Sequence, residues 1–383
     1  MNWTVPLFDP DLGPEEEQAL VDVIHSKWLT MGDRTKAFEA RFAEEIGVPV
    51  ALACNSATAA LHMALEALGV GPGDDVVVPS LTFVATANAV RYCGARPVFA
   101  DVASLDEWNV DARSIERALT PATRAVVVVH YAGYACDMPG IMALARARGL
   151  AVVEDVAHAP CVALDGASLG AWGDAGCFSF FSNKNMTTAE GGMVTTRRPE
   201  LAERLSRLRS HGMTTLTLDR HKGHAFGYDV TALGFNYRMS ELNAALGLVQ
   251  LAHVRERNAR RAAHVARYRQ QLAALPLRLP FGTFRGESAY HLMPVLLPED
   301  CDRLLIMSRM REQGVQTSIH YRPVDTFTAY VEAGLGPSTS VPLSHRIGHG
   351  VITLPLYPSM REEQIDHVCR ALGAALREAG VAG

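Results

Sequence analysis

From residue 48 to residue 154 the chain alternates short β-branched runs with longer stretches whose apolar residues recur at helical spacing, as at Leu61, Leu65 and Leu68. This alternation predicts strands at residues 48–54, 75–78, 97–101, 124–130 and 150–154. The helices between them are predicted at residues 58–68, 83–92, 110–119 and 139–148. Because strands that are joined through helices run parallel, we expect an α/β fold, a three-layer sandwich with a mostly parallel central sheet. Ligands of such sheets bind beyond the carboxyl ends of the strands.

The rest of the chain predicts a second, smaller unit. From about Leu201 the helical stretches lengthen, and one long helix is expected over residues 240–275. We therefore expect a large domain at residues 1–275, with the N-terminal segment 1–47 packed on it, and a smaller C-terminal α+β domain at residues 276–383. The smaller domain is predicted to hold strands at 291–297 and 316–320 and helices at 303–313 and 362–378.

Charge, hydropathy and cysteine usage exclude several classes of protein. The net charge of −5 argues against a nucleic-acid or anionic-membrane partner. No apolar run approaches the roughly 20 residues that span a bilayer, and the N-terminus lacks the regions of a signal peptide. The seven cysteines form no CxxC pair, which favours buried reduced thiols in a cytoplasmic protein. The residues His211, His221 and His224 lack ligand spacing, so we expect no metal.

Lysine is rare in this chain, which makes each lysine informative. Of the 36 basic residues Lys and Arg, only Lys27, Lys36, Lys184 and Lys222 are lysine. Three of these fit surface positions, in helical N-terminal segments or a polar loop. Lys184 differs, because it follows the apolar run 178–181 and precedes Glu190-Gly191-Gly192 and a new strand. A lysine held in a cleft between core strands can have a lowered pKa, and its neutral amine can then form a Schiff base.

Two further motifs supply groups that would complement such a lysine. Asp155 follows the apolar strand at 150–154, and a carboxylate there can pair with a protonated pyridine nitrogen. A helix cap or a salt bridge would explain the same residue equally well. Ala57 and Thr58 lie where a strand passes into a helix, and a helix N-terminus with hydroxyls binds phosphate. Ordinary N-capping would also explain that pattern.

Taken together, several ordered motifs resemble the DegT/StrS-type sugar aminotransferases, which are fold-type I enzymes that use pyridoxal 5′-phosphate (PLP). The resemblance covers nearly the whole chain and rests on these segments: Asn55 to Leu61, Gly71 to Asp74, Pro79 to Thr86, Glu154 to Ala159, Ser179 through Lys184 to Gly192, Gly234 to Met239, and His320 to Pro323.

The resemblance implies a role for each matching residue. Lys184 would hold PLP as a Schiff base and carry the proton between cofactor and substrate carbons, and Asp155 would pair with the pyridine nitrogen. The remaining implied roles are ring stacking by Phe83, phosphate binding by Ala57, Thr58 and Ser179, contact with the other subunit's phosphate by Asn236, and a place near the ring oxygen for His158.

The resemblance also implies the reaction. It is a ping-pong transamination from an amino acid, with glutamate the expected donor, to a keto sugar, usually nucleotide-linked, in a homodimer with shared active sites. Two departures from the usual pattern, at Pro160-Cys161 and Phe181-Ser182-Asn183, leave the substrate open. A cyclitol or non-sugar ketone, or another PLP reaction on the same fold, therefore remains an alternative. Dehydratase relatives replace the lysine with histidine, so Lys184 argues against that reaction, and a non-catalytic regulator would not need Lys184 and Asp155 together.

Overall fold

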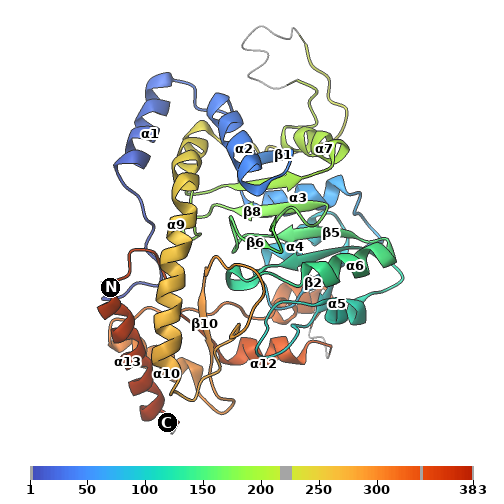
Figure 1. Cartoon of the computed structure of the whole chain (residues 1–383). Coiled ribbons are helices and arrows are strands. Elements are labelled where there is room, and N and C mark those ends of the chain that lie inside the picture. The colour runs from blue at the N-terminus through green and yellow to red at the C-terminus, as the bar shows by residue number, and fades with distance from the viewer. Residues whose placement is uncertain (1–2, 216–226, 337–339, 382–383) are drawn as a thin grey trace.

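A computed structural model describes residues 3–215, 227–336 and 340–381 (Figure 1). Most of its strands form one seven-stranded sheet in the order β1-β9-β8-β5-β4-β2-β3. Only β9 runs antiparallel to its neighbours, and the other strand pairs are parallel. The strands of this sheet are β1 Val50–Cys54, β2 Asp75–Pro79, β3 Arg96–Ala100, β4 Thr123–Val129, β5 Ala151–Asp155, β8 Ala175–Ser179 and β9 Gly192–Thr196.

Helices cover both faces of this sheet, as the alternation of the sequence predicts. One apolar layer packs beneath α3, α4 and α7; the other packs beneath α2, α5, α6 and the first half of α9. The predicted three-layer α/β class is therefore confirmed. The helices are α1 Pro14–Ser26, α2 Asp33–Ile46, α3 Ala57–Ala67, α4 Ala85–Tyr92, α5 Ala112–Ala118, α6 Met138–Arg148, α7 Pro199–Arg209 and α9 Glu241–Leu272. A short 3-10 turn, η1, spans Tyr131–Gly133.

The long helix α9 connects this sheet with the C-terminal part of the chain (Figure 1). Its last turns share an apolar cluster with a small antiparallel sheet and the helices beside it. The division at residue 275/276 stays a prediction. The C-terminal elements are β10 Met293–Leu296, α10 Arg303–Glu312, η2 Val324–Thr326, α11 Thr328–Glu332, α12 Pro342–Gly350, β11 Val351–Leu354 and α13 Glu362–Glu378, and a separate small hairpin is formed by β6 Ala163–Leu164 and β7 Ala167–Ser168.

One predicted strand, at residues 316–320, is wrong. In that segment only Ser318 pairs with β11, through Thr353. The partner of β11 over its whole length is β10, and Pro323, which cannot donate to a ladder, follows soon after. The segment is therefore an irregular edge, and it carries the residues His320 and Tyr321 toward the sheet.

Packing between α2 and α9 shows how the N-terminal helices are held. The cap residue of α2 is Gly32, which has no side chain to bind the free backbone N–H groups of the first turn. The buried carboxylate of Glu241 takes that role, accepting from Gly32 N at 2.8 Å and Thr35 N at 2.9 Å. A β-carbon at Gly247 would lie 2.6 Å from the ring of Phe38, so glycine allows the two helices to approach closely.

Candidate active site

A cavity of about 300 Å³ lies at the carboxyl ends of the parallel strands β4, β5 and β8. This is the end of an α/β sheet where ligands bind. Seven of the eight predicted site residues line it together: Ala57, Thr58, Phe83, Asp155, His158, Ser179 and Lys184. The cavity therefore gathers residues that are more than a hundred positions apart in the chain.

Lys184 lies in the loop between β8 and β9, and its side chain lines the cavity. A turn holds the loop, with Lys184 N donating to Phe181 O at 2.9 Å. Burial lowers the pKa of Lys184 from the ordinary 10.5 to about 8, and the negative charge of Asp155 opposes part of that shift. A substantial fraction of the amine is thus neutral near pH 7.5, as a nucleophile or proton acceptor requires.

The residue next to Lys184 anchors the loop. Asn185 Nδ2 donates to Asn258 Oδ1 and to Ala289 O, both at 2.7 Å. Because a carbonyl can only accept, this fixes the orientation of the Asn185 amide, and its Oδ1 then accepts from His291 Nδ1 at 2.8 Å. All of these groups are buried, so the backbone beside Lys184 has little freedom. Local sequence patterns do not reveal this anchor, because its partners come from α9 and from a loop more than a hundred residues downstream.

The two carboxylates at the end of β5 face opposite sides of the sheet, since successive side chains of a strand alternate. Asp155 faces the cavity, where it accepts from Thr86 Oγ1 at 2.9 Å and from Ala157 N at 3.1 Å. Burial raises the pKa of Asp155, while these hydrogen bonds and the charge of Lys184 act in the other direction. A cation placed beside Asp155 would favour its ionised form.

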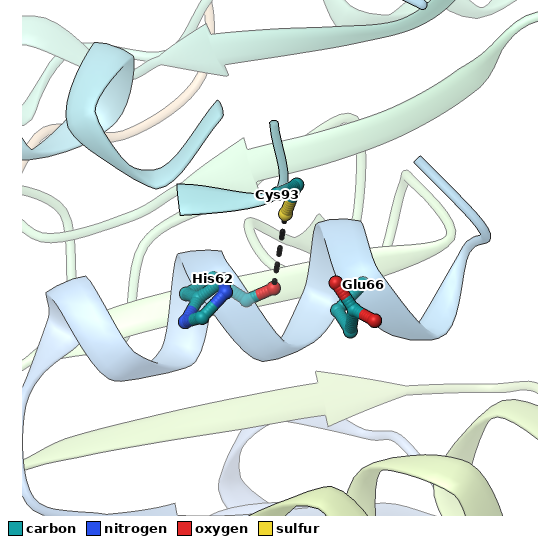
Figure 2. A group of neighbouring side chains, drawn as sticks. All are labelled: His62, Glu66 and Cys93. Atoms are coloured by element: carbon teal, nitrogen blue, oxygen red, sulfur yellow. Dashed lines mark hydrogen bonds between the residues drawn. The ribbon is translucent and has the colours of Figure 1, made fainter. Parts of the chain in front are cut away.

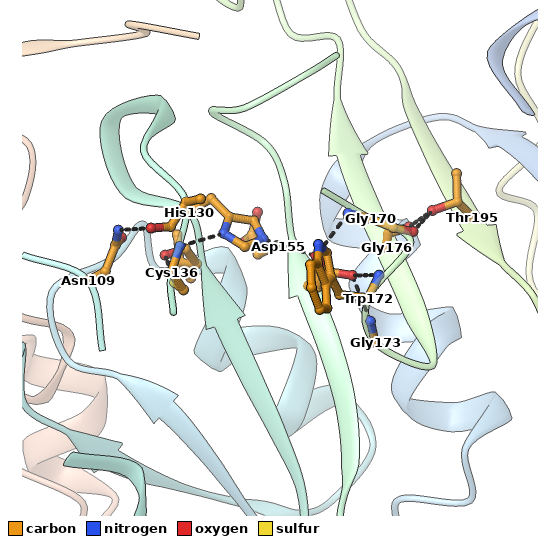
Figure 3. Close-up of polar contacts among 12 residues, drawn as sticks. Asn109, His130, Cys136, Asp155, Gly170, Trp172, Gly173, Gly176 and Thr195 are labelled. Carbon is orange, nitrogen blue, oxygen red and sulfur yellow. Dashed lines mark hydrogen bonds and ion pairs between the residues drawn. The ribbon is translucent and has the colours of Figure 1, made fainter. Parts of the chain in front are cut away.

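Glu154 is fully buried on the other side and has a structural role. It accepts from the backbone N–H groups of Gly170, Trp172 and Gly173 at 2.8 to 2.9 Å, and it pairs with His130 Nε2 at 3.1 Å. Figure 3 labels the partners His130, Gly170, Trp172 and Gly173. Glu154 thereby ties the 170–173 loop to the strand that presents Asp155.

The N-terminus of α3 also lines the cavity and, unlike the carboxylate of Asp155, attracts negative charge. Its cap residue Ser56 accepts from Ala59 N at 3.1 Å. The N–H groups of Ala57 and Thr58, in the first turn, have no intrahelical acceptor. A β-carbon at Gly192 would lie 2.5 Å from the Ser56 carbonyl, so glycine lets β9 pass directly beside this helix start.

These residues fit PLP. The cavity offers a carboxylate for a pyridine nitrogen, an amine for an aldehyde and a helix N-terminus for a phosphate. Phe83 is 56% exposed, which is unusual for so large an apolar side chain, and its ring lines the cavity. It thus has a free face for a flat heterocycle.

His158 lines the cavity, and its expected place near the ring oxygen stays a prediction. Both of its ring nitrogens already have partners: Ala132 N at 3.3 Å and Tyr321 Oη at 3.0 Å. Tyr321, which also lines the cavity, was not identified as a site residue. Its only sequence signal was its place in the His320 to Pro323 motif. Thr86 was missed as well, since nothing in the sequence shows that α4 reaches Asp155.

Asn236 lies outside the lining of the cavity. It forms a bridge with Ser210, and its carbonyl accepts from Asn55 Nδ2 at 3.5 Å. Its expected contact with the phosphate site of another subunit stays a prediction.

One cluster in the described ranges has side chains of the types that bind metals: His62, Glu66 and Cys93 (Figure 2). None of the three lines the cavity. His62 Nδ1 is already within 3.1 Å of Tyr237 Oη, and burial raises the pKa of the Cys93 thiol to about 12. We interpret the cluster as packing between α3 and α4. Lys222, His221 and His224 lie outside the described residues.

The cysteines and the helices of the structure bear on two further expectations, reduced thiols and the lack of a membrane span. All seven cysteines are free and buried, as expected. Among the described helices, none has the length and apolar character that a membrane span requires.

Comparisons with known proteins identify the family of the chain. The model of the DegT/DnrJ/EryC1/StrS aminotransferase family matches residues 10–373. The spore coat polysaccharide biosynthesis protein SpsC of Bacillus subtilis (strain 168) is 37% identical over 377 residues, which cover 97% of each chain. Among solved structures, the PLP form of Spr1654 from Streptococcus pneumoniae superposes with a TM-score of 0.91 at 30% identity, covering 98% of this chain and 99% of the other. PseC of Helicobacter pylori, an aminotransferase involved in the biosynthesis of pseudoaminic acid, superposes with a TM-score of 0.89 at 29% identity, covering 98% and 99%. The chain therefore belongs to the DegT/DnrJ/EryC1/StrS aminotransferase family and is an aminotransferase.

Proposed function

We propose that this enzyme uses PLP to transfer an amino group from an amino acid, with glutamate as the expected donor, to a keto sugar linked to a nucleotide. Membership of the family supports a sugar as the class of acceptor, as do the names of two relatives, which refer to polysaccharide and pseudoaminic acid biosynthesis. The nucleotide, the donor and the position of the keto group are the finer parts of the proposal.

One observation carries the proposal: Lys184, Asp155 and the N-terminus of α3 share a single cavity. Bound PLP supplies an electron sink for the carbon that loses a proton. The amine of Lys184, whose pKa is about 8, can accept that proton and return it near neutral pH. In the same cavity, Asp155 stabilises positive charge and the helix N-terminus stabilises negative charge.

We further propose that the active enzyme is a homodimer whose two cavities are each completed by the partner. Apolar side chains in the segment that precedes Asn236 support this, because Tyr228, Val230 and Leu233 are all exposed and Leu233 is 92% exposed. Exposed apolar side chains are typical of a protein–protein contact where they gather in one patch. A cavity completed by a second chain would admit two unlike substrates in turn. The cytoplasm is the proposed location, since reduced buried thiols are usual there.

The test begins with the cofactor. The purified protein should be yellow, and borohydride should attach the cofactor permanently to one peptide. Because the chain has only four lysines, mass spectrometry can assign the adduct without ambiguity. We expect it on Lys184, with no adduct in Lys184→Ala and an unchanged adduct in the control Lys27→Arg.

The substrates are then identified in two half-reactions. Amino acids are added first, and the cofactor spectrum shows which of them converts PLP to its amine form. Nucleotide-linked keto sugars, free keto sugars and cyclitol ketones are then offered to that form. Restoration of the PLP spectrum by cyclitol ketones alone would contradict the sugar assignment, and turnover by Lys184→Ala would contradict the mechanism.

A further inference from the structure

Hydrogen bonds run in one direction from the backbone to the cavity through His158 and Tyr321. The first link joins Ala132 N to His158 Nδ1 at 3.3 Å, and the second joins His158 Nε2 to Tyr321 Oη at 3.0 Å. A backbone amide can only donate, so His158 Nδ1 is the acceptor and the single ring proton is on Nε2. Burial and the charge of Lys184 lower the pKa of His158 well below its ordinary value, so the ring is neutral.

The proton on His158 Nε2 makes the Tyr321 oxygen an acceptor, which leaves the hydroxyl hydrogen of Tyr321 to point elsewhere. In residues 3–215, 227–336 and 340–381 we find no acceptor for that hydrogen. The ring of Tyr321 lines the cavity, and its centroid lies 5.9 Å from that of Phe83. Burial and the nearby carboxylate of Asp155 raise the pKa of Tyr321, so the hydroxyl keeps its proton. The Tyr321 hydroxyl is thus a neutral hydrogen-bond donor to the cavity, with its oxygen held by His158.

The surrounding rings hold this donor in place. His158 and Tyr321 stack at 17°, with their centroids 5.9 Å apart. Tyr131 meets Tyr321 edge-on at 6.2 Å and 88°, and the Tyr131 hydroxyl donates to the carbonyl of the adjacent residue, His320. A donor whose orientation is fixed before the ligand binds loses little entropy on binding.

We propose that Tyr321 donates a hydrogen bond to the phenolic oxygen of the PLP ring, and that His158 is the positioning residue that orients the hydroxyl. This rests on the proposed function. The location of the pair supports contact with that oxygen, because His158 and Tyr321 line the same cavity as Lys184 and Asp155. In PLP the phenolic oxygen projects from the ring edge between the pyridine nitrogen and the aldehyde carbon. Because Tyr321 shares the cavity with the acid and the amine that would hold those two parts of the ring, we assign its hydroxyl to the oxygen on that edge.

The test is the pH titration of the bound cofactor, followed by its absorbance without substrate. A hydrogen bond donated to the ring oxygen stabilises its anionic form, so Tyr321→Phe should raise the pH midpoint at which the bound cofactor loses its proton. A charge-assisted hydrogen bond implies a rise of about one pH unit. His158→Ala should move the midpoint in the same direction by less, because the hydroxyl remains but is no longer oriented.

Tyr330→Phe is the matched control. The hydroxyl of Tyr330 donates to Asn88 Oδ1 at 2.7 Å, and neither residue lines the cavity. The control should leave the midpoint unchanged. An unchanged midpoint in Tyr321→Phe, with cofactor still attached to Lys184, would overturn the present inference alone. Failure of the wild-type protein to attach PLP at Lys184 would instead overturn the proposed function.

A second measurement covers the case in which Tyr321→Phe does not fold. In cofactor-free wild-type protein labelled with ¹⁵N-histidine, the proton of His158 should be on Nε2, with the resonance assigned by its absence in His158→Gln. A proton on Nδ1 would reverse the direction of the hydrogen bonds and overturn the inference.

Discussion

Replacing Asp155 by Asn should lower the pKa of Lys184 below the value of about 8 that the native cavity gives it. Two effects set that value. Burial disfavours the charged amine and lowers the pKa, whereas the negative charge of Asp155 favours the charged amine and raises it. Asn is nearly the same size as Asp but carries no charge, so only the second effect is removed.

The expected size of the change in the Lys184 pKa follows from these two opposing effects. A nearby opposite charge shifts a pKa by about 1–3 units. We take about one unit, the low end of that range, because burial is the larger of the two effects on Lys184. With a pKa of about 8, about a quarter of the Lys184 amine is neutral at pH 7.5. After the substitution the neutral form should be the major one at that pH.

Competitive trace acetylation of the cofactor-free protein measures this directly, because the reagent modifies only neutral amines. Digestion separates the lysine peptides, and the exposed Lys27 serves as an internal reference for the reagent. The labelling of Lys184 is then plotted against pH for the native protein and for Asp155→Asn. A native midpoint near the ordinary 10.5, or a midpoint that rises in the variant, would refute our account of the cavity's electrostatics.

Three other perturbations have expected outcomes. Glu154→Ala should lower the free energy of unfolding by about 3–5 kcal/mol in a urea titration, because it leaves several buried donors without an acceptor. Gly192→Ala should weaken PLP binding about tenfold or more in a cofactor titration, because its β-carbon would press on Ser56 at the start of α3. If Asn236 completes the partner's site, mixing inactive Lys184→Ala and Asn236→Ala proteins should restore part of the activity, since one site in each mixed dimer is intact.

Each of these has a matched control. Glu116→Ala removes an exposed carboxylate that pairs with Arg148 at the surface, so its effect on stability should be under about 1 kcal/mol. A β-carbon at Gly71 would meet nothing within 4 Å, so Gly71→Ala should bind PLP normally. If Glu116→Ala destabilised the protein as much as Glu154→Ala, the role given to the buried carboxylate would be contradicted. If Gly71→Ala weakened PLP binding as much as Gly192→Ala, the contact with Ser56 would not be the cause. For the mixing experiment, no gain in activity after confirmed subunit exchange would count against a shared site.

Much of the fold could be predicted because its strands are short, β-branched and regularly separated by helices. The β5 run at residues 151–155 is one such case, predicted to within a residue or two at each end. The order of the strands could not be predicted, since nothing local shows that β9 inserts antiparallel between β1 and β8. The strand expected at 316–320 was wrong because a strand needs a partner along its whole length. In this segment only Ser318 pairs with β11, and Gln316 N instead donates to Val5 O.

Some residues of the candidate site could likewise be predicted from the sequence, and others could not. Lys184 and Asp155 were predictable because each is a chemically distinctive residue directly after an apolar strand, and such positions meet at one edge of a parallel sheet. Tyr321, Thr86 and Asn185 were not assigned roles, because their importance comes from contacts between segments far apart in the chain.

By itself, the sequence determined which reactive groups the chain carries and that they follow its strands, because periodicity and residue chemistry are local properties. Only the tertiary structure decided that Glu154 turns into the core while Asp155 faces the cavity, and that His158 donates to Tyr321. These outcomes depend on burial and on hydrogen-bond direction, which exist only once distant segments have packed together.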